Sequence, residues 1–215
     1  MSDDTRERIL AAAGPIFATK GIESATIREI CQSAGVNVAA VNYHFGDKEH
    51  LYLETVRLAH RSRTEHAPPE ALVTASTAEE RLAAFIRMSL QRMLTTAEHD
   101  WQTGLLLREM MHPTQACRTV VEEFIRPNHD MLLSIVSELV PPGIPEHRLE
   151  QIAFSIIGQC MLYRVAREFV GILIPREQRE KKFQIDQLAE HITAFSISAL
   201  AEMHCVSPTI EKELS

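Results

Sequence analysis

The sequence predicts an all-α protein. Apolar residues recur at helical spacing, as Ile9, Ala13, Ile16 and Phe17 do near the N-terminus, and strand-like alternation bounded by turns does not stand out. Helix-capping residues and glycine or proline stops divide the chain into segments of helical length. The chain has 215 residues, of which 45% are apolar, and this is enough for one large helical domain or two small ones.

The N-terminal part contains four predicted helices with clear starts and stops. The first ends at Lys20-Gly21, because glycine readily takes the left-handed conformation of a helix end. Thr26-Ile27-Arg28-Glu29 matches a capping box, in which the Thr26 hydroxyl accepts from the Glu29 amide and the Glu29 carboxylate binds back to the cap. Asn37 and Asp47 are suitable N-caps for the third and fourth helices. We expect the four helices to end at about residues 20, 33, 45 and 63.

A domain boundary is predicted near Pro68-Pro69, since two prolines cannot continue a helix. We therefore expect an N-terminal domain of residues 1–63 and a C-terminal domain of residues 64–215. A second capping box, Thr77-Ala78-Glu79-Glu80, opens the C-terminal helices. Those helices are expected over residues 77–96, 100–111, 115–139 with a bend at Pro127, 145–171 and 184–204.

Charge is distributed unevenly along the chain. The formal net charge is −7, whereas residues 1–63 carry eight basic and eight acidic side chains, so the negative excess belongs to residues 64–215. An acidic body disfavours non-specific coating of nucleic acid. The charge distribution is still compatible with a small neutral N-terminal domain that binds DNA through a few specific side chains.

Several function classes lack their usual sequence features. The chain has no run of 18 apolar residues and no secretory signal pattern, so we expect no membrane association and a cytoplasmic location. The four cysteines form no CxxC pair, which favours reduced thiols, and the ten histidines show no metal-binding spacing. We therefore expect neither a metal nor a cofactor.

The strongest motif lies in residues 26–45, where two short capped helices are joined by the turn Ala34-Gly35-Val36. Apolar residues such as Ile30 and Val41 supply an inward face. This arrangement predicts a helix-turn-helix, whose second helix enters the major groove of DNA. An ordinary helical hairpin is the alternative.

The same segment closely resembles the DNA-binding domain of TetR-family transcriptional regulators. The stretch Tyr43-His44-Phe45-Gly46-Asp47-Lys48-Glu49, with Leu51, is especially specific to that family, and the resemblance spans about residues 5–55. Arg108-Glu109-Met110, with His112-Pro113-Thr114, also resembles the CecR-like (DUF1956-type) C-terminal subclass. The resemblance implies a three-helix DNA-binding domain followed by a helical effector-binding and dimerisation domain.

Candidate DNA contacts follow from the chemistry and from the resemblance. Unpaired amides at the helix that Asn37 caps can bind phosphate. The resemblance implies that Tyr43 and His44 clamp the DNA backbone, that Lys48 binds phosphate and that Arg28 reaches the groove or backbone. Thr26 is a cap and a candidate phosphate ligand.

The predicted recognition helix, residues 37–45, contains no lysine or arginine. Direct readout then depends on Val38, Ala39, Ala40 and Asn42, whose methyl groups can touch thymine and whose amide can pair with adenine. We expect operator positions that lean towards A/T, with one G read by Arg28. Alternatively, the three apolar residues only support the helix.

A dimer interface is predicted in the last two long helices. The step pattern of residues 185, 188, 192, 195 and 199 is that of an a/d seam, and residues 149–160 carry a second apolar stripe. In the resembled family these helices form the homodimer; burial inside one subunit is the alternative, and the two are compatible. The interface residues expected are Leu149, Ile152, Ile156, Leu188, Ile192, Phe195 and Ala199.

The body of the chain is expected to hold a small-molecule effector, as the resemblance implies. Methionine-rich surroundings tolerate varied apolar ligands, and a few polar groups would orient them. Each candidate is also an ordinary core residue in the alternative interpretation. The candidates are Trp101, Arg108, Met111, His112, Gln159 and Tyr163.

The sequence thus predicts a homodimeric, ligand-responsive transcriptional regulator. We expect a repressor that a small-molecule effector releases from a palindromic operator in double-stranded DNA. Two alternatives stay open: a helical protein-interaction module without sequence-specific DNA binding, and an all-helical enzyme. The enzyme alternative lacks a GxGxxG, P-loop or GxSxG motif, and no catalytic residue is predicted.

Overall fold

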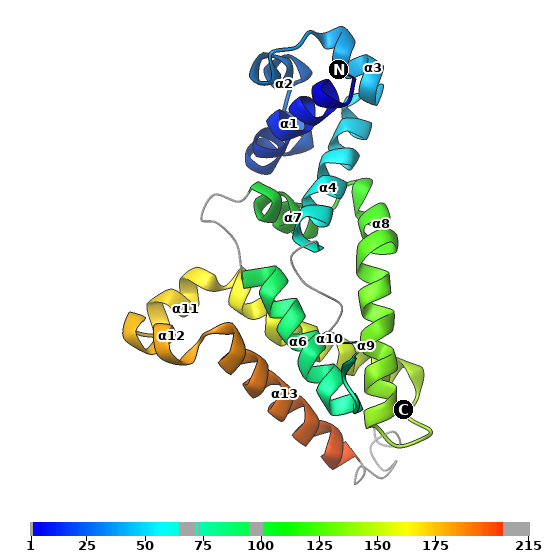
Figure 1. Cartoon of the computed structure of the whole chain (residues 1–215), viewed down its shortest axis with the longest axis vertical. Coiled ribbons are helices and arrows are strands. Elements are labelled where there is room, and N and C mark those ends of the chain that lie inside the picture. Colours follow the sequence, from blue (N-terminus) through cyan, green and yellow to red (C-terminus); the bar gives the residue numbers. More distant parts are fainter. Residues whose placement is uncertain (1, 65–71, 73, 95–100, 204–215) are drawn as a thin grey trace, which may run out of the picture. The chain divides into compact units, whose positions relative to one another are not determined.

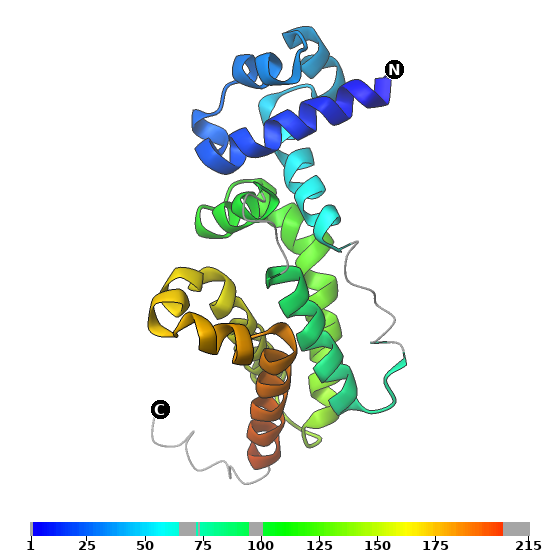
Figure 2. The same cartoon turned by 60° about the vertical axis from the view of Figure 1, so that its left-hand side comes forward.

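The computed structural model describes residues 2–64, 72, 74–94 and 101–203, and no β-strand occurs among them, which confirms the all-α prediction. The helices form two compact units, each with its own apolar core (Figures 1 and 2). The first unit contains α1 (Ser2–Ser24), α2 (Ile27–Ala34), α3 (Val38–Phe45), α4 (Lys48–Thr64), α7 (Trp101–Met111), α8 (Ala116–Val120) and the π-helix η1 (Val121–Ile125). The second unit contains α6 (Ala78–Leu94), α9 (from Arg126 to Leu139), α10 (Glu146–Val165), α11 (Arg167–Leu173), α12 (Arg176–Lys182) and α13 (Ile185–Glu202).

The packing units differ from the two predicted domains in one respect. The helices α7 and α8 pack with α1–α4, although more than thirty residues separate them from α4 in the sequence. The boundary of the first unit falls at Pro127. The predicted functional boundary at residue 63 therefore stays a prediction. It does not coincide with the boundary between the two packing units.

Short-range capping fixes the starts of α2 and α3 as the sequence predicts. The Thr26 hydroxyl accepts from the Glu29 amide at 3.2 Å, and the Asn37 side chain accepts from the Ala40 amide at 2.9 Å. Gly35 ends α2 with a positive φ of 64°. The Glu29 carboxylate departs from the predicted capping box because it pairs with Lys20 of α1.

The capping box at the start of α6 is complete. The Thr77 hydroxyl accepts from the Glu80 amide at 3.1 Å, and the Glu80 carboxylate accepts from the Thr77 amide at 3.1 Å. Asp47 similarly accepts from the amide of His50 at 2.8 Å. Thr77 and Glu80 predicted the first of these N-termini and Asp47 alone predicted the second, and both caps act over three residues.

Glycine lets α7 approach α1 closely, and α7 lies beside α1 and α4 in both views (Figures 1 and 2). A Cβ at Gly14 would meet the Trp101 ring at 2.5 Å, so only glycine fits beneath that ring. Gly21, with φ of 72°, breaks the helical path of α1 near the predicted stop. A Cβ there would meet the Arg108 guanidinium at 2.5 Å.

A buried carboxylate then joins α7 to α4. Glu109 is only 3% exposed and accepts from the Tyr52 hydroxyl at 2.7 Å. It also accepts from the amide of Thr114 at 2.8 Å and from the Thr114 hydroxyl. These donors replace the water that the carboxylate loses, as a buried charge requires. Burial, with the hydrogen bond to Glu109, raises the pKa of Tyr52 far above its ordinary value.

The predicted bend at Pro127 takes the form of a π-helix. Proline has no amide to donate to the carbonyl four residues earlier, and its ring crowds that carbonyl. The turn before Pro127 widens accordingly into η1. Glu123 of η1 pairs with Arg57 of α4, with Nε and Oε2 2.9 Å apart, so α4 is tied to this segment as well as to α7.

The second unit packs around α6, which contacts both α10 and α13 (Figure 2). Leu82, Ile86 and Leu90 of α6 are fully buried there. Proline at residue 145 starts α10, as predicted, but the expected helix to residue 171 is interrupted at Ala166. The short charged helix α12 differs from the sequence prediction, in which Pro175 only separates two longer helices.

The buried Tyr52–Glu109 contact predicts an alkaline loss of stability. Above about pH 10 the unfolded chain ionises Tyr52 and the folded chain does not, so the unfolded state holds fewer protons and stability falls by about 1.4 kcal/mol per pH unit. Tyr52→Phe should lower stability by about 1.5–3 kcal/mol at neutral pH and flatten this slope. Urea denaturation from pH 7 to 11 measures both effects.

The matched control is Tyr163→Phe. Burial also raises the pKa of Tyr163, but its hydroxyl makes no such contact with a carboxylate among the described residues. The control should keep most of the alkaline slope. An unchanged slope in Tyr52→Phe would show that the hydroxyl does not resist ionisation in the folded protein.

Candidate DNA-binding and effector sites

The structure contains the predicted helix-turn-helix within the first unit. Ile30, Cys31 and Ala34 of α2 and Val41 and Phe45 of α3 are buried in one core. Their burial fixes which faces of the two helices remain outside. The opposite face of α3 is therefore available to DNA.

The predicted contact residues lie at the start of α2, along α3 and at the start of α4, and none of them is fully buried. Val38 is 47% exposed and Tyr43 is 82% exposed. The remaining candidates are Thr26, Arg28, Asn37, Ala39 and Asn42, which are exposed, and Ala40, His44 and Lys48, which are half-buried. As DNA contacts, all ten stay predictions.

Three of the polar candidates already have contacts within the fold. The Lys48 ammonium donates to the carbonyl of Ala25, 3.4 Å away, just before the N-terminus of α2. A cation beside free helix amides forms a suitable phosphate site. The Tyr43 and His44 rings meet edge to face, with centroids 5.0 Å apart, so each restricts the other's orientation.

Sequence reasoning missed the role of Arg8 in supporting the turn. Its guanidinium donates to the carbonyls of Ala34 at 2.6 Å and Gly35 at 3.3 Å, and so caps the end of α2. It lies 26 residues from Ala34 in the sequence, and no local signal marks such a contact. Arg6 is comparable, because it lies over the Phe45 ring and pairs with Glu54.

The effector candidates divide between the two units. Trp101, Arg108, Met111 and His112 belong to the first unit, whereas Gln159 and Tyr163 belong to the second. As ligand contacts they stay predictions.

The structure gives Trp101 and Arg108 a structural role. The Trp101 ring covers Gly14, and Arg108 donates to the carbonyl of Lys20 at 3.2 Å. Both side chains are used in docking α7 on α1. Met111, which is 64% exposed, and His112 have no comparable contact given by the described residues.

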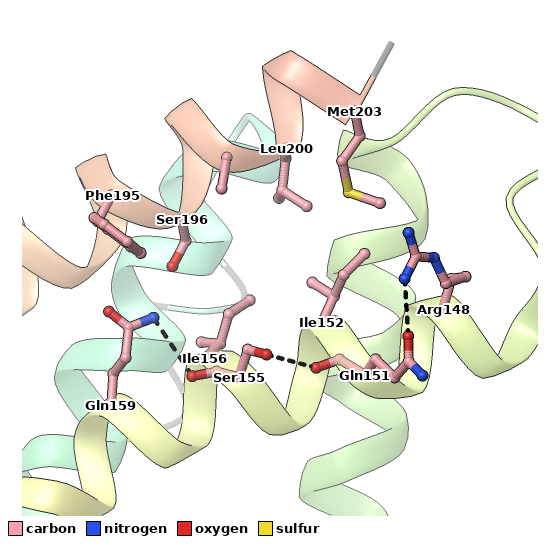
Figure 3. Close-up of a pocket in the computed structure, with 11 residues that line it drawn as sticks. Arg148, Gln151, Ile152, Ser155, Ile156, Gln159, Phe195, Ser196, Leu200 and Met203 are labelled. Carbon is pink, nitrogen blue, oxygen red and sulfur yellow. Dashed lines mark hydrogen bonds between the residues drawn. The ribbon is translucent and has the colours of Figure 1, made fainter. Parts of the chain in front are cut away.

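A groove of about 400 Å³ lies between α10 and α13 of the second unit (Figure 3). Gln159 and Ser155 line it from α10, and Phe195 and Ser196 line it from α13. The Ser196 hydroxyl is buried and has no hydrogen-bond partner among the described residues. Tyr163 lies outside this lining, with its ring centroid 6.4 Å from that of Phe183.

The predicted dimer residues divide into core and surface. Ile156, Leu188 and Ile192 are at most 4% exposed and pack inside their own subunit, which is the alternative that the sequence left open. Leu149 and Ile152 are half-buried against the same core. Phe195, at 59% exposed, and Ala199 are the two that remain on the surface.

Two searches of the described residues bear on other functions. No group of three or more metal-binding side chains lies together in the described parts of the chain. Among the same residues, every helix is too short or too polar to cross a membrane.

The architecture and the exposed helix-turn-helix define a DNA-binding transcriptional regulator. The chain matches the model of the tetR family of bacterial regulatory proteins over residues 9–55 and that of the C-terminal domain of the HTH-type transcriptional dual regulator CecR over residues 78–200. It belongs to the TetR family, in the group with the CecR-type C-terminal domain. The resemblance predicted from residues 43–49 is confirmed.

Individual relatives agree with this assignment. CecR of Shigella flexneri is 28% identical over 178 residues, which cover 78% of this chain and 79% of that protein. The structure resembles HlyIIR, a hemolysin II transcriptional regulator, with TM-score 0.60, 19% identity and coverage of 93% and 98% of the two chains. It also resembles AibR in complex with isovaleryl coenzyme A and operator DNA, with TM-score 0.62, 18% identity and coverage of 89% and 97%. CecR is a transcriptional dual regulator, and the two solved structures show that the fold is shared.

Asn42 provides a test of base recognition. Asn42→Ala should relax sequence preference at one base pair per half-site and cost about 1–3 kcal/mol on the preferred sequence, because an amide paired with adenine would be lost. Binding-site selection with the variant and the parent protein measures the preference. Equal preferences at every position would remove Asn42 from base readout.

Tyr43 provides the matched test of backbone contact. Its hydroxyl is exposed, so Tyr43→Phe should leave the fold intact and weaken binding to all duplexes by a similar factor. Fluorescence anisotropy on the selected operator and on a scrambled duplex measures this factor. A loss confined to the operator would assign Tyr43 to base readout instead.

Proposed function

We propose that the chain is an effector-responsive repressor that binds a palindromic operator as a homodimer. The single observation that carries the proposal is the exposed face of α3, held by a capped N-terminus and a buried opposite face. A second helix with this support is suited to the major groove. Its location in the cytoplasm follows from its target, since the operator is there.

Few cations in the helix-turn-helix are available to DNA. Lys20 is paired with Glu29, Arg8 caps α2 and Arg6 is paired with Glu54. Arg28 and Lys48 remain as the cations placed near the recognition surface. We expect them to act with the free amides of α2 and α3, giving about four to eight phosphate contacts per dimer.

The base contacts proposed are mostly apolar. Val38, Ala39 and Asn42 are exposed along one side of α3, with Ala40 partly exposed. Methyl groups favour thymine and an amide favours adenine, so the contacted positions lean towards A/T. Arg28 is the side chain placed to recognise a single G.

The homodimer follows from the symmetry of the operator. Two recognition helices about one DNA turn apart, roughly 34 Å, match a palindrome. We assign the interface to the outer faces of α10 and α13; on α13, Phe195 and Ala199 are exposed. Two such helices from each subunit form a four-helix bundle.

Effector control is proposed as linkage between ligand binding and DNA binding. An effector that binds the DNA-incompetent state more tightly shifts the dimer towards it, and a coupling of about 1–3 kcal/mol changes operator affinity by about 5–150-fold. The crystallised complex of AibR contains both a coenzyme A thioester and operator DNA, which supports such a fold holding two kinds of ligand. Of the predicted ligand residues, Met111, His112, Gln159 and Tyr163 remain the candidates.

The first experiment measures DNA binding directly. Fluorescence anisotropy should show at least about 10³-fold tighter binding to the DNA upstream of the protein's own gene than to a scrambled duplex, at about 150 mM salt. The slope of log affinity against log salt should lie between about −4 and −7, because few phosphates are contacted.

If both duplexes bind equally and weakly, the next experiment is selection of binding sites from random DNA, because the operator can lie elsewhere. Failure to enrich any sequence there would contradict the proposal and favour a protein-interaction module. A salt slope steeper than about −10 would show that more cations reach the DNA than the structure assigns.

A further inference from the structure

Two arginines of α1, Arg6 and Arg8, contact the helix-turn-helix at the two ends of α3. Helix α1 packs against both α2 and α3 (Figure 2). Arg8 lies at the turn that precedes α3, and Arg6 lies at Phe45, the last residue of α3. Residues two positions apart on a helix are about 200° apart around its axis, so the two side chains leave α1 in different directions.

The contact of Arg8 supplies donors that the end of a helix lacks. Its Nη2 donates to the carbonyl of Ala34 at 2.6 Å and to that of Gly35 at 3.3 Å. Carbonyls at a helix C-terminus have no partner within the helix and form the negative end of its dipole, so a guanidinium there is favourable. Asn37, the N-cap of α3, follows only two residues after Gly35. A fixed turn therefore also fixes the start of α3.

The contact of Arg6 acts at the other end of α3. Its guanidinium carbon lies 5.3 Å from the centre of the Phe45 ring, within the range of a cation–π contact. The same guanidinium pairs with Glu54 of α4. Phe45 is only 7% exposed and belongs to the core of the first unit. Arg6 therefore joins α1, the end of α3 and α4 at one place.

Helix α1 is itself held by the rest of the first unit. Ile9, Ala13 and Phe17 of α1 are fully buried in its core. Helix α7 packs closely on α1, because the Trp101 ring occupies the space that a Cβ at Gly14 would need. The core thus fixes the helix from which both arginines extend.

Helix α3 needs accurate placement because its base-facing side chains are short. Residues 37–45 contain no lysine or arginine, and the proposed readout uses Val38, Ala39, Ala40 and Asn42. After a small tilt of its helix, a long side chain recovers a contact by changing rotamer, whereas alanine has no rotamer to change. Contacts with base edges therefore depend on where the backbone of α3 lies.

We propose that Arg6 and Arg8 are positioning residues for base readout, which set the angle at which α3 enters the major groove without contacting a base. The inference rests on the proposed DNA-binding function and adds to it a source of sequence specificity outside the helix-turn-helix. Contacts with phosphate carry little sequence information and do not require the same accuracy as contacts with base edges. Loss of either arginine should therefore weaken binding to the operator more than binding to other DNA.

A direct phosphate contact is the competing role for Arg8, because its side chain is exposed and a guanidinium has five N–H donors. The two roles predict different losses. A positioning residue affects the ratio of operator affinity to scrambled-duplex affinity. A phosphate contact lowers both affinities by a similar factor and reduces their salt dependence.

The test compares an operator selected from random DNA with a scrambled duplex, by fluorescence anisotropy at about 150 mM salt. Arg8→Ala should lower the affinity ratio at least about 10-fold, while the affinity for the scrambled duplex falls less than about 3-fold. Arg8→Lys should recover part of the ratio, because an ammonium can donate to a carbonyl but lacks the planar fork of donors. Arg6→Met should lower the ratio in the same direction.

Lys20→Met is the matched control. It removes the same charge from α1 and breaks a pair with Glu29 of α2, but it touches neither end of α3. The affinity ratio should stay within about twofold of the parent value. Circular dichroism of each variant confirms that the helices are retained.

Two results would overturn the proposal. Equal losses on both duplexes in Arg8→Ala, with a salt slope shallower by about two per dimer, would make Arg8 a phosphate contact. An unchanged affinity ratio in both Arg8→Ala and Arg6→Met would leave the two arginines with a role in stability alone.

Hydrogen exchange of the free protein gives a readout that needs no operator. Amides of residues 36–41 should exchange faster in Arg8→Ala than in the parent and in Lys20→Met, because the turn loses its contact with α1. Unchanged exchange there would overturn the positioning role even where operator binding is intact. A parent protein that enriches no sequence, together with faster exchange in Arg8→Ala, would instead contradict the proposed DNA-binding function and leave the hold on the turn standing.

Discussion

The close approach of α7 to α1 is the constraint on which the first unit depends. Gly14 and Gly21 have no side chains, so the Trp101 ring and the Arg108 guanidinium lie directly on the backbone of α1. This distance brings the Glu109 carboxylate within reach of the Tyr52 hydroxyl on α4. A bulkier residue at either glycine would push α7 away, and a buried carboxylate would then lose a donor that it needs. Helix packing and the polar network therefore depend on each other.

Several basic side chains of the first unit are engaged in contacts within that unit, and this explains why few cations remain near the face that we propose to bind DNA. Three basic side chains join helices of the first unit. Arg6 pairs with Glu54, Arg8 caps the end of α2, and Lys20 pairs with Glu29. Arg57 likewise joins α4 to Glu123 of η1, and it also pairs with Glu54 within α4. Rigid positioning reduces the ordering cost of binding, so a few well-held contacts can replace a diffuse positive surface. The acidic body is consistent with specificity that comes from geometry more than from net attraction.

Local features of this fold were predictable from the sequence, and distant contacts were not. The caps at Thr26, Asn37 and Thr77 act within three residues, so their signals are visible in the sequence alone. The role of Arg108 depends on a backbone carbonyl 88 residues away, and nothing beside Arg108 indicates it. The sequence predicted Arg108 as a ligand contact, whereas in the structure its guanidinium donates to a backbone carbonyl of α1. The exposed face of α3 was predictable because its opposite face is marked by apolar residues at helical spacing.

The division between core and interface in α10 and α13 has a physical reason. A sequence with two neighbouring stripes at similar spacing buries the more apolar one within its own subunit, because that burial is required for the unit to fold at all. Ile156, Leu188 and Ile192 form that stripe. What remains outside combines polar positions with a few exposed large apolar side chains, among them Phe154 of α10 and Phe195 of α13. The best apolar seam in a sequence is therefore a better guide to a helical subunit's core than to its interface.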